Sequence, residues 1–516
     1  MKILLSCIIA FSLIPLFLLV QHNLIYAGIA SLLPISLLVI LVALKSRSGV
    51  GKLDSKLVTA IIHMYVVSMG EVGPKEILNS VAKTREYGVY SRIFKTIRGL
   101  AIDMGHGISK ALSQVAKTVK PPLKDILIRM TEAFSTTVPR DFLELEASTI
   151  LEEYYGYYTR SLESLRVVGG VFSTFQSVSV FIVLTVAVMT IFMADPSIIP
   201  LAYIVAAFSM AIMLIVFRMV SPKESIVYIH RDPPEKIRIF RLSLFLIPLA
   251  GVAGCLIYIL LKDFSYVFLI VGSVLLIPGL LAYMIERSVL TLDEYYPTFL
   301  KSLGENLSST LNMKSALEYS THVQLGPLDR LARNTLKWIL LGISYERSLL
   351  LMGIESTSNL IFTFNRILSD IFRSGSPPLK ACKTLSNVVI RFLEFRKRRL
   401  SAAKGVEMTV IILQPITIFL LVTISGLMKF FTNILQPLPY FPFNTIPLNL
   451  IQLGNALLVF LISTLNSLAI VEVKGSFKWV FLLYNSILLL ISGVTWIVGN
   501  LLIGNVFSMF QLGAPI

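Results

Sequence analysis

Long apolar runs alternate with polar, helix-patterned stretches along this chain. Nine runs approach or exceed the roughly 20 apolar residues that a helix needs to cross the hydrocarbon layer of a membrane. Because backbone polar groups in lipid must be satisfied within the segment, each run is predicted to be a transmembrane helix. The nine runs are Ile3–Val20, Leu24–Leu44, Val171–Met193, Ile198–Val220, Leu242–Leu261, Phe264–Ile285, Val406–Met428, Leu450–Val471 and Trp479–Ile503.

Two polar stretches, residues 45–166 and 286–405, separate these runs. In both, apolar residues recur at helical spacing and glycine and proline break the pattern, which predicts short helices packed as a bundle. The fold class is therefore all-α: a polytopic membrane protein of about nine transmembrane helices with two helical bundles. The last helix of the first bundle is predicted to bury one face, formed by Leu151, Tyr154, Tyr155, Tyr158, Leu162 and Leu165.

Turn-forming residues divide the second polar stretch. Asn312 is expected to end a helix in the left-handed conformation, and Ser344 to cap the start of the next short helix, which Gly353 ends. Ser376, Pro377 and Pro378 are expected to open another helix. Two buried faces are predicted here, one formed by Leu360, Phe364, Ile367, Leu368, Ile371 and Phe372, and one by Leu379, Cys382, Leu385, Val389 and Phe392.

The two polar stretches share a pattern at a single offset along the chain. At the offset that places Pro139 on Pro377, Gly105 falls near Gly342 and Tyr154 falls near Phe392. A pair of apolar runs follows each stretch. Several coincidences at one offset predict an internal duplication of the unit formed by a bundle and a membrane pair.

Composition and charge set the orientation. The 516 residues are 55% hydrophobic and 15% charged, with mean hydropathy +0.78 and net charge +16. If the N-terminus is inside and nine helices alternate, all Lys and Arg except Lys262 and Lys429 lie inside, as the positive-inside rule requires. This predicts a multi-pass cell-membrane protein with both bundles in the cytoplasm and the C-terminus outside. The positive charge then faces the membrane, and a nucleic-acid partner is not expected.

The resulting order is a membrane pair, a bundle, two further pairs separated by a basic cytoplasmic loop, a second bundle, three membrane helices and an external tail. The boundaries are 1–44, 45–166, 167–220, 221–241, 242–285, 286–405, 406–503 and 504–516.

A basic cluster lies just before the seventh apolar run, formed by Arg396, Lys397, Arg398 and Arg399. Such a cluster is typical of a juxtamembrane anchor to lipid. It would also suit electrostatic docking of an acidic partner. The sequence leaves both interpretations open.

Motifs that carry chemistry are missing from the sequence. The segment ending in Lys52 lacks the first glycine and the final Ser or Thr of a phosphate loop. Five histidines and three cysteines are scattered without metal-ligand spacing. We expect no enzyme activity, no cofactor and no metal.

The apolar runs contain no charged residue in their interiors, whereas transporters usually place such residues at depth. A transporter of a neutral solute stays open as an alternative, because amides such as Gln414 could bind one. Gln414 and Pro415 are also the best hinge candidate, although a tolerated kink is the simpler interpretation.

The chain resembles the inner-membrane platform proteins of type II secretion, type IV pilus and archaellum machines, the archaeal branch most of all. The resemblance rests on short-helix, Leu-Gly-x-Ser and Ser-Gly-x-Pro-Leu segments that contain Gly326, Pro327, Gly342, Ser344, Gly375 and Pro377. The first bundle departs from this pattern, because Pro139 follows Ser135-Thr136-Thr137-Val138 without a glycine.

The resemblance implies a platform that couples a hexameric cytoplasmic secretion-type ATPase to insertion of pilin-like filament subunits, and that forms a homodimer. Two other classes stay open. One is a secondary transporter of a neutral solute, and the other is a subunit of a protein-translocating channel.

Overall fold

The computed structural model describes residues 53–135, 139–193, 198–435 and 448–512. In this part of the chain seven helices are long and apolar enough to cross a membrane, and they contain the third to ninth predicted runs. The first two predicted runs lie outside the described residues. The chain is therefore a multi-pass, helical membrane protein.

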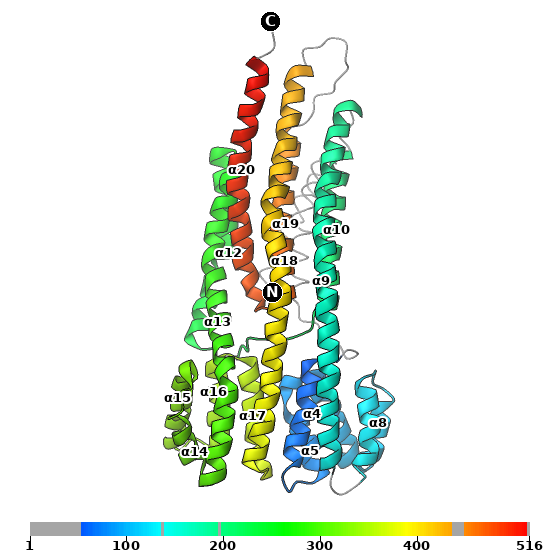
Figure 1. Cartoon of the computed structure of the whole chain (residues 1–516), viewed down its shortest axis with the longest axis vertical. Helices are drawn as coiled ribbons and strands as arrows, with labels where there is room; N and C mark the ends of the chain where they lie inside the picture. The colour runs from blue at the N-terminus through cyan, green and yellow to red at the C-terminus, as the bar shows by residue number, and fades with distance from the viewer. Residues whose placement is uncertain (1–52, 136–138, 194–197, 436–447, 513–516) are drawn as a thin grey trace.

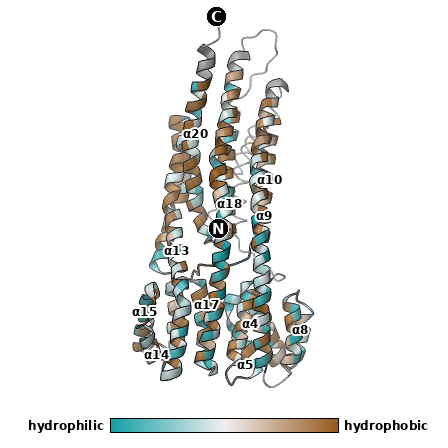
Figure 2. Cartoon of the chain, viewed as in Figure 1, coloured by the Kyte–Doolittle hydropathy of each residue, from teal (hydrophilic) through white to brown (hydrophobic). Residues whose placement is uncertain are grey.

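Long helices form one half of the elongated molecule and short helices the other (Figure 1). Figure 2 shows hydrophobic residues concentrated in the long-helix half and hydrophilic ones among the short helices. Three helices continue through both halves, namely α9 (Arg140–Met193), α13 (Phe264–Thr310) and α18 (Pro378–Leu435). Beside them in the apolar half lie α10 (Ile198–Val220), α12 (Leu246–Leu261), α19 (Leu448–Lys474) and α20 (Phe481–Leu512).

The first bundle surrounds a buried central helix, α4 (Ser55–Ser68), in which every residue from Leu57 to Ser68 is buried. Asp54 caps its start by accepting a hydrogen bond from the Leu57 N–H at 2.9 Å. The buried face predicted for the lower part of α9 is confirmed at Tyr154, Tyr158, Leu162 and Leu165, while Leu151 and Tyr155 are half-buried. The other helices are α5 (Pro74–Lys83), α6 (Val89–Arg98), α7 (Ile108–Ala116) and α8 (Leu123–Ala133).

The second bundle packs short helices against the lower parts of α13 and α18. They are α14 (Met313–Ser320), α15 (Asp329–Leu340), α16 (Tyr345–Ser356) and α17 (Asn359–Ser374). The predicted start of α18 at Pro378 is confirmed, and so are both predicted buried faces, with two exceptions. Phe372 is half-buried, and Leu379 is exposed because it lies in the first turn of α18, at the end of the bundle.

Two predicted helix ends are wrong. Leu311, not Asn312, takes the left-handed conformation, with φ 52°. Asn312 caps α14 instead, accepting from the Lys314 N–H, because the next helix starts at once. Gly353 does not end α16, which continues to Ser356. A Cβ at Gly353 would lie 2.8 Å from the Phe362 Cα atom, so this glycine allows α16 and α17 to approach closely.

Helix order and spacing are alike in the two bundles. Corresponding helices start at nearly the same separation along the chain: α5 at Pro74 and α14 at Met313, α7 at Ile108 and α16 at Tyr345, α9 at Arg140 and α18 at Pro378. The packing is also alike. In the first bundle α4 packs against α9, and in the second bundle the lower part of α13 packs against α18.

Residues 221–234, here called the strap, connect α10 to α11 (Glu235–Ser243). The Tyr228 N–H donates to the Thr357 carbonyl at 2.8 Å, and the Asn359 N–H donates to the Ile226 carbonyl at 2.9 Å. The Tyr228 ring stacks on Phe362 with centroids 4.0 Å apart. The segment predicted only as a basic loop is thus attached to the second bundle.

Candidate functional site

A buried ion-pair network lies where the bundles meet the membrane helices, a region called the junction below. Arg396 of α18 donates hydrogen bonds to Asp293 of α13 and to Glu224 of the strap. The Ser358 hydroxyl donates to the other oxygen of Asp293. Arg396 is 7% exposed and Asp293 fully buried, so solvent screens these charges little. The network joins two long helices and the strap.

Arg399, one turn further along α18, stabilises the end of α19. Its guanidinium donates to the carbonyl oxygens of Glu472 at 2.7 Å, Val473 at 2.8 Å and Pro222 at 2.8 Å. The last carbonyls of a helix lack partners within the helix, and a cation suits the negative end of its dipole. Gly475 follows with φ +67°, and a Cβ there would lie 2.4 Å from the Arg399 Cζ atom.

The predicted basic cluster is thus divided between the interior and the surface. Arg396 and Arg399 lie inside the chain, which differs from the exposed cluster expected for a lipid anchor or a docking site. Lys397 and Arg398 are exposed: the Lys397 ammonium lies 3.6 Å from Glu294, and Arg398 donates to the Tyr155 hydroxyl at 2.7 Å. Residues three positions apart lie on the same face of a helix. The spacing of Arg396 and Arg399 was therefore the sequence signal that these two residues face inward together.

The other predicted motif residues lie in turns and at helix starts along the chain. Glycines 105, 326, 342 and 375 all have positive φ, which explains the residue type. At Gly326 a Cβ would also lie 2.7 Å from the Tyr295 ring. Ser344 occupies the N-cap position of α16 without a side-chain cap hydrogen bond. Pro139 directly precedes α9, Pro377 directly precedes α18, and Pro327 lies in the short helix Gly326–Leu328.

Gln414, half of the predicted hinge, connects three membrane helices. Its side-chain nitrogen donates to Ser463 of α19 at 2.7 Å and to Ser492 of α20 at 3.1 Å. Its oxygen accepts from Asn466 at 2.9 Å. Helix α18 continues through Pro415, so the structure shows a helix bound to its neighbours at this position.

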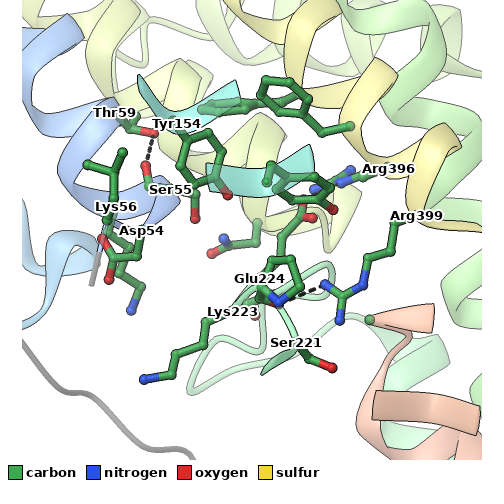
Figure 3. A pocket seen from close by; sticks show the side chains of 18 of the residues that line it. Asp54, Ser55, Lys56, Thr59, Tyr154, Ser221, Lys223, Glu224, Arg396 and Arg399 are labelled. Carbon is green, nitrogen blue, oxygen red and sulfur yellow. Dashed lines mark hydrogen bonds and ion pairs between the residues drawn. The ribbon is translucent and has the colours of Figure 1, made fainter. Parts of the chain in front are cut away.

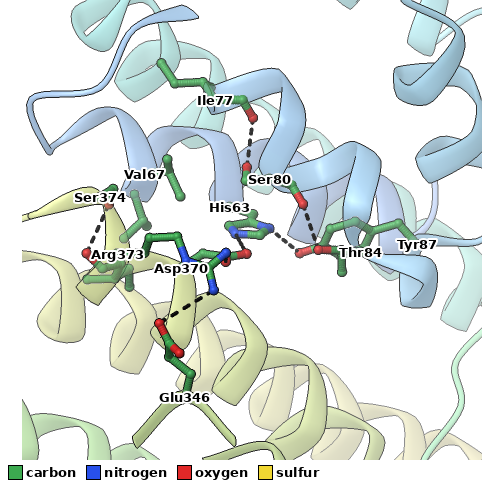
Figure 4. Close-up of polar contacts among 12 residues, drawn as sticks. His63, Val67, Ile77, Ser80, Thr84, Tyr87, Glu346, Asp370, Arg373 and Ser374 are labelled. Atoms are coloured by element: carbon green, nitrogen blue, oxygen red, sulfur yellow. Dashed lines mark hydrogen bonds and ion pairs between the residues drawn. The ribbon is translucent and has the colours of Figure 1, made fainter. Parts of the chain in front are cut away.

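A second polar contact, between the two bundles, was not predicted because His63 looked isolated in the sequence. The His63 ring of α4 lies 3.3 Å from the Asp370 carboxylate of α17 and 3.0 Å from the Tyr87 hydroxyl (Figure 4). Nearby, the Ser376 hydroxyl donates to the Val66 carbonyl at the end of α4, at 2.9 Å. A Cβ at Gly70 would lie 2.1 Å from the Ser374 carbonyl oxygen, so the backbones of the bundles touch there.

Asp370 makes this contact sensitive to acid. Burial opposes its ionisation, but the hydrogen bond and charge of His63, with the Arg366 and Arg373 guanidinium groups, outweigh burial and lower the pKa of Asp370. A lowered pKa adds stability above the unfolded value of about 4, and that stability is lost as pH falls through the folded value. We expect Asp370→Asn to lower the melting temperature in detergent at pH 7, with the difference shrinking below about pH 4.

The exposed acid Glu394 provides the control, because its side chain faces solvent beside Arg391. Glu394→Gln should leave the melting temperature within about 1 °C of the unchanged protein at both pH values, since exposed pairs contribute little. A difference for Asp370→Asn that stays constant from pH 7 to below pH 4 would contradict the assignment.

A cavity of about 450 Å³ also lies at the junction and is called the junction cavity below. Its walls come from the start of α4, from α9 and α18, from the strap and from the segment after α19. In Figure 3 Asp54 and Lys56 lie on one side, Arg399 on the other, and Glu224 of the strap between them. Burial raises the pKa of the Asp54 carboxyl, and its hydrogen bond with the Leu57 N–H partly opposes the rise. Among the described residues no group of His, Cys, Asp or Glu could hold a metal ion.

The geometry so far is that of a helical framework: charged side chains bind helices to one another, and glycines allow close backbone contact. The chain is similar to flagella accessory protein J of Methanocaldococcus jannaschii. The two are 25% identical over 390 residues, which cover 71% of this chain and 69% of flagella accessory protein J. Neither polar stretch is that long, so the similarity includes membrane-spanning segments. No family model matches the chain, and no solved structure matches it.

Proposed function

We propose that this protein is the membrane platform of an archaellum-like or type IV pilus-like filament assembly machine. The observation that supports this most is the architecture: α9, α13 and α18 run unbroken from polar bundles into apolar membrane segments. The similarity to flagella accessory protein J, an accessory protein of flagella by its name, supports the same role.

In the proposed mechanism both bundles lie in the cytoplasm, with the N-terminus inside and the C-terminus outside. A hexameric secretion-type ATPase moves the bundles, and the three continuous helices carry that motion to filament subunits in the lipid. The ion pairs of Arg396 and the helix cap made by Arg399 keep the bundles and the membrane helices together during the movement.

The proposal includes an internal duplication. The nearly constant separation between the starts of corresponding helices, with α4 and α13 in equivalent positions, supports it. The proposal also includes a homodimer, which cross-linking of the protein in its own membrane tests by the appearance of a band of twice the mass.

Co-purification tests the proposed function. A tagged full-length chain, cross-linked in intact cells and purified in mild detergent, should bring a secretion-type ATPase and pilin-like subunits with it, identified by mass spectrometry. The outcome against the proposal is a preparation without either partner, accompanied by substrate-dependent flux or ion conductance in vesicles. That result would favour a transporter or a channel subunit.

The divided basic cluster sharpens this experiment. Replacing all four basic residues would also remove Arg396 and Arg399 from the interior, so loss of a partner could reflect unfolding. Lys397→Ala with Arg398→Ala changes only the exposed pair. If the pair is a docking site, ATPase recovery should fall several-fold while the melting temperature stays within about 2 °C. Unchanged recovery would contradict a docking role for these two residues.

A further inference from the structure

We propose that the junction cavity holds the phosphate headgroup of an anionic membrane lipid from the leaflet on the side of the bundles. The proposal does not depend on the platform function. Four observations carry it: the position of the cavity, its apolar wall, its charge, and two hydroxyl groups left without partners.

The cavity lies level with the ends of two membrane helices. Ile215 and Met219 from the last turns of α10 and Val471 from the end of α19 form part of its wall. Apolar runs end there, at the depth where lipid headgroups begin. The cavity thus lies at the boundary between the apolar membrane segments and the polar bundles, the depth expected for a lipid headgroup.

Basic side chains outnumber acidic ones around the cavity. Six basic residues line it, Lys56, Arg218, Lys223, Arg396, Arg399 and Lys478, against four acidic ones, Asp54, Glu86, Glu224 and Glu472. The Glu224 carboxylate and Arg396 are bound to each other, and Arg396 also binds Asp293, which is not in the lining. The Asp54 carboxylate accepts a hydrogen bond from the first turn of α4. Lys56 and Lys223 line the cavity and are exposed, and an exposed ammonium group attracts an anionic headgroup.

Two buried hydroxyl groups on the cavity walls have no hydrogen-bond partner among the described residues. They belong to Tyr158, which is 1% exposed, and Ser221, which is 4% exposed. Buried polar groups are rarely left without a partner, because each one costs free energy. A phosphate offers several strong acceptor oxygens and would satisfy hydroxyl donors of this kind.

Lipid retention tests the proposal. The full-length chain is reconstituted with equal amounts of dioleoyl phosphatidylglycerol and dioleoyl phosphatidylcholine, returned to detergent, and weighed by native mass spectrometry. The unchanged protein should retain one phosphatidylglycerol per chain. Lys56→Ala with Lys223→Ala should weaken retention about tenfold or more, since each cation near a lipid surface contributes appreciably to binding.

Two matched variants separate this effect from folding. Lys117→Ala with Lys120→Ala removes two exposed lysines of the same bundle that do not line the cavity, and this variant should retain lipid like the unchanged protein. Ser221→Ala should weaken retention without lowering the melting temperature, because the Ser221 hydroxyl has no hydrogen bond to lose. Equal retention in all variants, or equal retention of phosphatidylcholine, would overturn the proposal. Displacement of the lipid by 10 mM inorganic phosphate would do so as well, because it would identify a site for soluble phosphate.

Discussion

Arg396→Ala should leave little folded protein. The change removes the cation between Asp293 and Glu224 and leaves two carboxylates close together in a buried site. Removing one partner of a buried ion pair costs about 3–5 kcal/mol, which is a large part of the stability of a typical domain. The measurements are the yield of monodisperse protein in mild detergent and the melting temperature of what remains.

The neighbouring residue is the control for this prediction. Lys397→Ala removes an adjacent basic residue whose side chain is 70% exposed and whose carboxylate partner is 53% exposed. It should change stability by less than about 1 kcal/mol. Arg396→Met combined with Asp293→Asn and Glu224→Gln should recover part of the lost yield, because no unpaired charge remains. Equal yields for Arg396→Ala and Lys397→Ala would show that the network does not hold the junction together.

Gly70→Ala should push the two bundles apart. The added methyl group would lie 2.1 Å from the Ser374 carbonyl oxygen and 3.0 Å from the Ser376 nitrogen, and both are backbone atoms that cannot rotate away. Overpacking of this kind costs about 1–3 kcal/mol. The hydrogen bond from Ser376 to the end of α4 and the contact between His63 and Asp370 should weaken with it. Faster amide hydrogen exchange at the end of α4 and in α17 would report the separation.

Gly73→Ala is the control for Gly70→Ala, because both glycines lie in the turn between α4 and α5. A Cβ at Gly73 meets nothing within 4 Å, and the residue is the N-cap of α5 with negative φ. Its hydrogen exchange at the end of α4 and in α17 should match that of the unchanged protein. If both variants exchange alike, the contact at Gly70 does not bind the bundles together.

Much of the helical framework followed from sequence because it depends on local chemistry. The length and apolar composition of the run Ile198–Val220 predict a membrane helix, and α10 has the same two ends in the structure. Proline at the first position predicts the start of α18. The prediction that a helix ends at Gly353 was wrong for a physical reason. Glycine is found both at helix ends and where two helices pack closely. Gly353 packs closely against Phe362 of the next helix, and the local sequence pattern does not show that contact.

The junction could be predicted only in part, because its contacts join residues far apart in the chain. Arg396 is 103 residues from Asp293 and 172 residues from Glu224. The basic cluster was visible, and helical spacing separates 396 and 399 from their neighbours. Which acids they meet depends on how α13, α18 and the strap pack, and no local pattern encodes that packing.

The length of the continuous helices has a mechanical consequence. At about 1.5 Å per residue, the 54 residues of α9 span about 80 Å and the 58 residues of α18 about 87 Å. A helix of that length acts as a lever. Tilting its base by about 5° displaces the far end by about 7 Å, more than the pitch of one helical turn. In a machine of the proposed kind, the length of these helices would set the displacement at the outer surface. Because each helix is continuous, no loop between the bundle and the membrane segment would reduce that displacement.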